Sequence, residues 1–191
     1  LNDFSSQAPS FLALSMEKES ERIQKIERKE KAALDRERWI ARQEFIQRDL
    51  EKMDEVVTQN IPLVVQKEYR KAAQSLTQLL PQLETAEGKE ALKNVREGYE
   101  RMESLKTFLV GAVEREPFRQ YAGTDLGGEV IGANSLGLRI SLGPGGTVVT
   151  SWDKVNIRTL LKMAVYYLSD ATRDPKERAE NMLAVAVFCY F

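Results

Sequence analysis

The fold is decided by one uninterrupted stretch, MEKESERIQKIERKEKAALDRERWIARQEFIQRDLEKMDEVV, which occupies residues 16–57. It contains no proline and no glycine, and most of its residues are Glu, Lys, Arg, Gln or Ala, which are good helix formers. Opposite charges four residues apart, as at Glu21 and Lys25, add support. The stretch therefore predicts a single helix about 60 Å long, at 1.5 Å per residue.

Apolar residues form two lines along this predicted helix. The first line consists of Ile23, Ile26 and Ala33, and the second of Trp39, Ile46, Leu50, Met53 and Val57. The second line has the spacing of a coiled coil, and its offset from the first is typical of a stutter. We expect it to pack against the following helix, which leaves the half before Arg38 with few apolar contacts. A partner protein or a second copy of the chain is expected to bind this half, through Ile23, Ile26, Ala33, Leu34 and Trp39.

Prolines predict where the long helix ends. Pro9 and several serines indicate an irregular arm over residues 1–15. At the other end, Thr58–Pro62 predicts a helix break, with Asn60 as the N-cap and Pro62 in the first turn of a second helix. An alternative is that Pro62 only kinks one continuous helix.

Two helices are predicted to form a hairpin after this break. The first ends or kinks at Pro81, and the second runs to about Val113 with a near-regular heptad pattern. The connection around Glu84–Gly88 is short, so these helices are expected to be antiparallel neighbours.

Glycine and β-branched residues become frequent after Pro117, which predicts a small sheet. The strand candidates are Glu129–Ile131, Leu138–Leu142 and Thr147–Trp152, and Gly143–Gly146 forms the turn between the last two. Asp153 or Asn156 is predicted to open the next helix, and Asp174 followed by Pro175 to open the last one. Trp152 is expected to be buried and to anchor the sheet to the helices that follow it.

Together these patterns predict a mainly α protein. It has a long helix and an antiparallel helical hairpin resembling a coiled coil, followed by a small antiparallel β-hairpin or three-stranded sheet packed on two C-terminal helices. The predicted parts are an irregular arm (1–15), a helical region (16–114) and a small β/α module (115–191). Because the chain begins at Leu1 and ends inside an apolar helix pattern, we expect an excerpt of a longer protein, truncated within this module.

The composition argues against catalysis. Histidine is absent and cysteine occurs once, as Cys189. Because histidine is the commonest general base and metal ligand, a Ser-His-Asp triad, a Cys-His pair and a zinc site are excluded. Cys189 lies in an apolar run and is predicted to be buried and unreactive. We therefore expect no enzyme activity, no catalytic residue, no metal and no cofactor.

Several motifs invite a functional interpretation but favour a structural one. Gly143–Gly146 leads into a strand without a Lys-Ser/Thr pair, so it indicates a turn and not a phosphate loop. Among the carboxylates near the sheet, Asp125 is interpreted as a turn former and Asp153 as a cap, and Glu129 has no evident companion base. Positive and negative charges nearly cancel, to a net charge of −1, so no nucleic acid partner is expected. No apolar stretch of about 18 residues occurs that could span a membrane.

Three short motifs carry a family resemblance: Gly128-Glu-Val130, Gly137-Leu-Arg-Ile140 and Val148-Val-Thr-Ser-Trp152-Asp153-Lys-Val155. They are similar to small SH3-like β-modules of uncharacterised bacterial proteins, in which a helical region precedes a compact sheet. The resemblance covers about residues 123–168. It implies a packing or interaction module and no activity.

The function expected from the sequence is that of a non-catalytic scaffold or protein–protein interaction segment of a larger bacterial protein. The long helix is expected to bind a protein partner or a second copy, while Trp152, Asp174 and Pro175 have structural roles. Two alternatives stay open. One is a nucleic-acid-binding module that uses the SH3-like sheet, and the other is an accessory region of an enzyme whose catalytic domain lies outside this chain.

Overall fold

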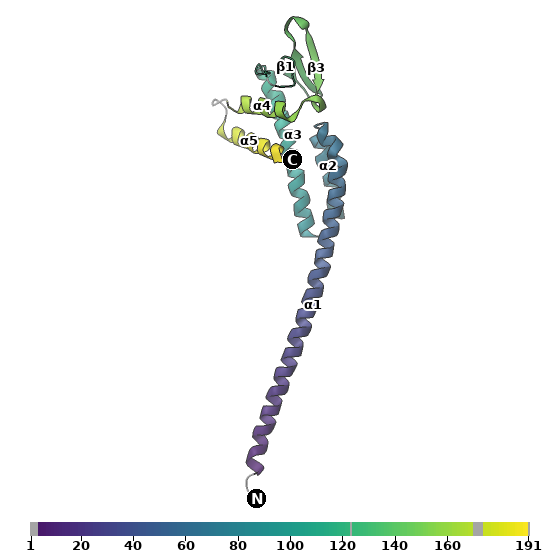
Figure 1. Ribbon diagram of the computed structural model, residues 1–191, viewed down its shortest axis with the longest axis vertical. Coiled ribbons are helices and arrows are strands. Elements are labelled where there is room, and N and C mark those ends of the chain that lie inside the picture. The colour runs from purple at the N-terminus through teal and green to yellow at the C-terminus, as the bar shows by residue number, and fades with distance from the viewer. Residues whose placement is uncertain (1–3, 123, 170–173, 191) are drawn as a thin grey trace. The chain divides into compact units, whose positions relative to one another are not determined.

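A computed structural model describes residues 4–122, 124–169 and 174–190, with side chains described over 15–122, 124–169 and 174–187. The chain divides into two compact units, Leu1–Arg48 and Asp49–Phe191. The helices are α1 (Phe4–Val65), α2 (Tyr69–Leu79), α3 (Ala86–Arg115), α4 (Ile157–Leu168) and α5 (Pro175–Tyr190), and the strands are β1 (Glu129–Ala133), β2 (Gly137–Ser141) and β3 (Thr147–Ser151) (Figure 1). Short 3-10 turns lie at Leu80–Gln82, Gly143–Gly145 and Trp152–Lys154.

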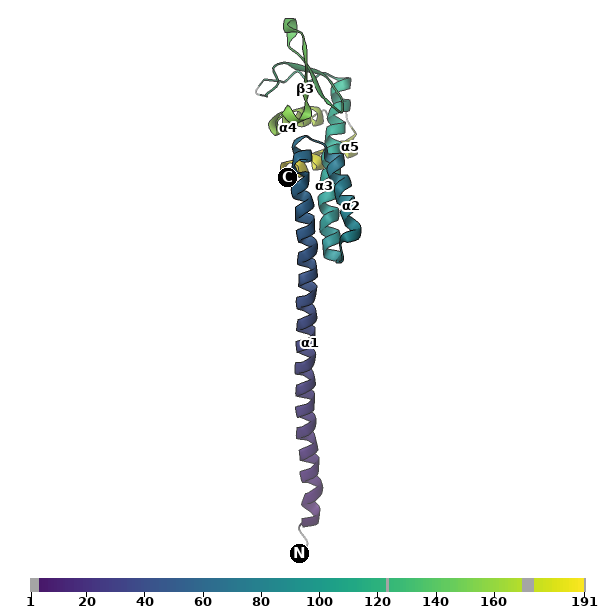
Figure 2. The same cartoon turned by 90° about the vertical axis from the view of Figure 1, so that its right-hand side faces the viewer.

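The predicted fold class is confirmed. The structure has a long helix, a helical hairpin and a three-stranded antiparallel sheet in the order β1-β2-β3, followed by two helices. Helices α2 and α3 lie side by side in the second unit (Figure 1, Figure 2). The turn between β2 and β3 contains two glycines with positive φ, Gly143 at 67° and Gly146 at 96°, which explains the glycine-rich sequence there.

Both predicted ends of the long helix are wrong. The irregular arm expected over 1–15 is helical from Phe4 onward, and the break expected at Thr58–Pro62 is absent because α1 continues to Val65. A proline lacks the backbone N–H and its ring crowds the carbonyl four residues back, and α1 continues for only three residues beyond Pro62. The alternative of one continuous helix kinked at Pro62 is also wrong, because α1 ends at Val65 and a separate helix, α2, begins at Tyr69.

Helix α1 ends instead at Val65, and Lys67, in the turn that follows, has a left-handed φ of 55°. The backbone N–H of Glu68 donates to the carbonyl of Leu63 at 2.8 Å, and that of Lys67 to Val64 at 3.0 Å, which is the pattern of a Schellman motif. The ammonium of Lys106, on α3, donates to the carbonyl of Lys67 at 3.0 Å. A cation at a helix C-terminus also complements the helix dipole, so Lys106 ties the end of α1 to α3.

Asn60 is not an N-cap but a buried link between α1 and α2. Its side chain is 3% exposed, donates from Nδ2 to the carbonyl of Ala72 at 3.1 Å, and accepts from the hydroxyl of Ser75 at 2.8 Å. Both polar atoms of this amide therefore have partners on α2, which a buried amide requires.

Asp49 makes a third link, between α1 and the connection that leads into α3. Its carboxylate is buried and accepts from the backbone N–H groups of Glu84 at 3.0 Å and Thr85 at 2.7 Å, and from the Thr85 hydroxyl at 2.7 Å. That hydroxyl in turn accepts from the N–H of Gly88, which makes Thr85 the N-cap of α3. A Cβ at Gly88 would lie 2.7 Å from the Cβ of Asp49, so only glycine fits there.

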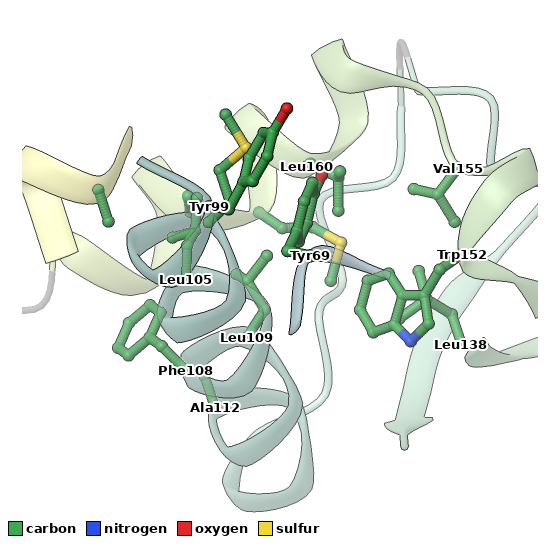
Figure 3. Close-up of a cluster of buried hydrophobic side chains, with 14 of the residues drawn as sticks. Tyr69, Tyr99, Leu105, Phe108, Leu109, Ala112, Leu138, Trp152, Val155 and Leu160 are labelled. Atoms are coloured by element: carbon green, nitrogen blue, oxygen red, sulfur yellow. The ribbon is translucent and has the colours of Figure 1, made fainter. Parts of the chain in front are cut away.

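The core of the second unit joins the helical hairpin to the sheet (Figure 3). Trp152 is 2% exposed, its indole N–H donates to the carbonyl of Asn134 at 2.7 Å, and the Lys106 ammonium lies 5.5 Å from its ring centroid. The side chains around it on the helical side include Tyr69, Met102, Leu105, Leu109 and Leu160. Trp152 therefore lines one cavity with residues of α2, α3 and α4, whereas the sequence pointed only to the helices that follow it.

Side-chain caps begin α3, α4 and α5. Asn156 accepts from the N–H of Thr159 at 2.8 Å at the start of α4. Asp174 accepts from the N–H groups of Lys176 and Glu177, at 3.3 and 3.4 Å, just before Pro175 begins α5. The burial predicted for Cys189 lies outside the described side chains.

We expect Asp49→Asn to lower the free energy of unfolding at pH 7 by about 2–3 kcal/mol, because an amide replaces a buried carboxylate that accepts three hydrogen bonds. Burial by itself raises the pKa of Asp49, but the hydrogen bonds from Thr85 and Glu84 outweigh it and hold the pKa below its usual value. The stabilisation is thus complete above about pH 4 and is lost as the pH falls through the folded-state pKa. Urea melts at several pH values should show a smaller acid-induced loss in Asp49→Asn. The exposed control Asp54→Asn should change little, and equal effects of the two variants would contradict the role of Asp49.

We expect Trp152→Ala to cost about 3–5 kcal/mol, since it removes a fully buried aromatic side chain. The chain's other tryptophan supplies the control: Trp39 is 63% exposed, so Trp39→Ala should change the free energy of unfolding by less than about 0.5 kcal/mol. Chemical denaturation of both variants measures the difference. Similar losses would mean that Trp152 is not the anchor.

We expect Lys67→Gly to stabilise the protein by about 0.5–1 kcal/mol, because glycine adopts a left-handed φ without the steric cost of a Cβ. Lys71→Gly, four residues on and inside α2, should have the opposite sign and cost about 1 kcal/mol. Thermal melts compare the two. A loss of stability in Lys67→Gly would show that its side chain outweighs the backbone strain.

Candidate partner-binding surface

The candidate functional site is a surface of α1 within the first unit. Every residue from 15 to 45 is exposed. The large apolar side chains among them are Met16, Ile23, Ile26, Leu34, Trp39, Ile40 and Phe45. Single exposed apolar residues are ordinary, but a row of them on one face indicates an interaction surface.

Helical geometry divides the predicted partner-binding residues into two sets. At about 100° per residue, Met16, Ile23, Ile26, Ala33, Leu34 and Phe45 lie within an arc of about 120°, and we call this arc the apolar face. Trp39 lies about 160° around the helix from Ile23. The structure therefore brings together four of the five predicted residues, Ile23, Ile26, Ala33 and Leu34, and places Trp39 on the opposite side of α1.

A basic row borders the apolar face. Lys18, Arg22, Lys25, Lys29 and Arg36 fall within an arc of about 60°, and no acidic residue between positions 15 and 45 shares it. Acidic side chains instead interrupt the apolar face itself, as at Glu19, Glu30 and Glu37. The basic row is not evident from the order of residues along the chain, because acidic residues alternate with basic ones there. Spacings of four, three and four residues, from Lys18 to Lys29, are the signal that identifies it.

The carboxylates near the sheet have different hydrogen-bond and ion-pair partners. Asp125 accepts from the N–H of Asn156 at 3.0 Å and from the hydroxyl of Thr159, which ties the loop before β1 to the start of α4. Burial raises the pKa of Asp125, but these hydrogen bonds outweigh it and lower the pKa overall. Glu129 instead pairs with Arg119 at 2.9 Å, and Asp153 is exposed.

Two lysines beside Trp152 have a perturbed pKa. Burial lowers the pKa of both Lys67 and Lys106, and the nearby carboxylates of Asp153 and Asp125 partly offset the effect at Lys67. Such lysines can act as nucleophiles. Here, however, the ammonium of Lys67 donates to the carbonyl of Val65 at 3.2 Å, and that of Lys106 donates to the carbonyl of Lys67. Both groups therefore cap the C-terminus of α1.

The second unit has cavities at its surface that are lined by polar as well as apolar side chains. One of about 490 Å³ lies at the sheet face that bears Arg139 and Val149, and Glu114 of α3 lines its side. Gly132 allows Arg139 to lie across β1, because a Cβ there would come within 3.0 Å of the guanidinium. Within the described residues, no group of three or more Cys, Asp or Glu side chains is arranged to hold a metal ion. Over the same residues, no helix has the length and apolar character needed to cross a membrane.

These observations define a helical protein with a small antiparallel sheet, whose candidate site is a surface and not a cavity. No protein-family model, curated protein or solved structure matches the chain. The resemblance of residues 123–168 to SH3-like modules stays a prediction, and three strands lie in the described part of that segment.

Proposed function

We propose that the chain is a non-catalytic scaffold or interaction segment of a larger bacterial protein, and that α1 binds a helix of another protein. The observation that carries the proposal is the apolar face of α1, on which Ile23, Ile26 and Leu34 are each about half exposed. These three side chains span about three turns of one helix, which suits helix-in-groove or coiled-coil recognition.

Covering this face would stabilise α1 more than its own charge pairs do. Full burial of an aliphatic side chain contributes about 1.5–3 kcal/mol, so covering the exposed half contributes about 1 kcal/mol for each residue. An exposed ion pair within a helix, such as Glu19–Arg22 at 3.8 Å, contributes only about 0.2–0.5 kcal/mol. A docked helix would therefore stabilise residues 15–45 as a helix more than their own ion pairs do.

The charges favour a different protein over a second copy as the partner. In a parallel, in-register pair each residue faces itself, so Glu30 in the apolar face would oppose another Glu30. In an antiparallel pair each flank meets its own copy, so the basic row would lie against a second basic row. A partner helix with an apolar seam and acidic residues along one flank avoids both conflicts.

The two alternative functions have no specific observation in their favour. A nucleic-acid site on the sheet needs several cations to neutralise phosphates, and the three strands contain one basic residue, Arg139. The accessory role beside a catalytic domain depends on sequence outside this chain.

We expect a photocrosslinking amino acid at Ile26 to capture a discrete partner protein in the source cells, and the same amino acid at Trp39, on the opposite side of α1, to capture none. A synthetic peptide of residues 15–45 should compete for the captured protein. With that partner purified, Lys29→Glu in the basic row should weaken binding about tenfold, whereas the neighbouring Arg28→Glu, about 100° around the helix, should have little effect.

Three results would count against this proposal. Equal crosslinking from both positions would mean that binding does not depend on the apolar face. Crosslinking from Ile26 to a second copy of the chain alone would replace the foreign helix by self-association. Absence of any captured protein, with the chain expressed at its natural level, would remove the interaction role of α1.

A further inference from the structure

Strand β3 is an edge strand of the sheet, because β2 is its only strand neighbour in the described structure. The backbone N–H of Leu142 donates to the carbonyl of Gly146 at 2.8 Å, which sets the alternation of the hairpin. With Ile140 opposite Val148 and Leu138 opposite Thr150, the backbone groups of Val148 and Thr150 point towards β2. Those of Thr147, Val149 and Ser151 therefore point outwards.

The sequence of this edge lacks the usual protection against pairing. Natural edge strands are commonly shielded by charged residues, prolines, bulges or a covering segment. The sequence of β3 is Thr-Val-Val-Thr-Ser, without charge or proline, and Val149 is 67% exposed. The opposite edge differs, because β1 is covered by Phe118, whose backbone exchanges two hydrogen bonds of 2.9 and 3.0 Å with Val130.

We propose that β3 pairs antiparallel with β3 of a second copy of this chain, centred on Val149. In that register Val149 lies opposite Val149 of the second copy and Thr147 lies opposite Ser151. All outward backbone groups then find partners, in six hydrogen bonds. This surface belongs to the second unit, and the inference does not depend on the partner of α1.

Self-pairing suits the edge for three reasons. The five residues carry no charge, so a twofold axis through Val149 brings no like charges together. The facing side chains are Val with Val, Thr with Ser and Val with Thr, which are favourable cross-strand pairs. Helix α3 packs against β1, the strand farthest from β3, and β3 has no second strand beside it in the described structure.

The extent of the contact predicts a weak dimer. Stable interfaces bury about 1,200–2,000 Å² in total, which is more than two five-residue strands cover. Association is therefore expected to depend on concentration, and to appear as the full chain is raised from about 10 μM towards about 1 mM.

The test follows amide hydrogen exchange of the full chain by NMR over that concentration range, together with sedimentation. The amides of Val148 and Thr150 should be protected throughout, because they donate to β2. Those of Thr147, Val149 and Ser151 should gain protection as the mass rises. Val149→Pro removes the central outward donor and should weaken the dimer at least about tenfold, whereas Val149→Thr keeps the donor and should not.

Protected Val148 and Thr150 amides in both variants would verify that the hairpin is intact. Rapid exchange at Thr147, Val149 and Ser151 in a chain that stays monomeric at about 1 mM would overturn the proposal. A rise in mass that Val149→Pro leaves unchanged would overturn it equally, and would assign self-association to another surface such as α1. Such a result would concern the proposed function of α1 and not the pairing of β3.

Discussion

The buried carboxylate of Asp49 is the contact on which the arrangement of the second unit depends. An ionised group out of water must have its hydrogen-bond capacity filled, and the partners available are the backbone of Glu84 and Thr85 and the hydroxyl of Thr85. A shift of α1 along the helical hairpin by one turn would leave the carboxylate without them. Apolar packing alone tolerates such a shift far better, so this polar contact sets the register of α1.

Two further polar contacts fix α1 at other points along the same segment. The side chain of Asn60 donates a hydrogen bond to the backbone of α2, and the ammonium of Lys106 on α3 donates one to the carbonyl of Lys67, just after the end of α1. Together with Asp49 they connect residues 49–67 to both helices of the hairpin and to its connection. The ammonium of Lys106 also lies over the ring of Trp152. Lys106 therefore connects the end of α1 to the core that contains Trp152. The sheet is therefore held by the hairpin, and in the described structure β3 has β2 as its strand neighbour on one side and none on the other.

The candidate surfaces differ in how far the sequence could predict them. Ile23, Ile26, Ala33 and Leu34 were predictable because helical spacing alone places them on one face. Trp39 was predicted to share this surface, but at about 100° per residue its position places it on the opposite side of the helix from Ile23. The basic row could have been predicted from the helical spacing of its residues, but acidic residues alternate with them along the chain and make the row hard to recognise. The free edge of β3 could not be predicted from the sequence, because the order of strands in the sheet decides which strand has a single neighbour.

Local patterns determined most of the secondary structure of this protein. The absence of proline and glycine over residues 16–57, the alternation in the strands, the glycines of the turn and the caps at Asn156 and Asp174 all act within a few residues. Tertiary contacts decided the rest. Asn60 resembles an N-cap in sequence and serves instead as a buried bond to α2, and Lys67 adopts a left-handed φ in the turn after α1 although glycine is the usual residue there. The physical reason is that a buried polar group needs a hydrogen-bond partner, and tertiary packing decides which group is within reach. The partner of the Asn60 side chain is the carbonyl of Ala72, 12 residues away, and the partner of the Lys67 carbonyl is Lys106, 39 residues away.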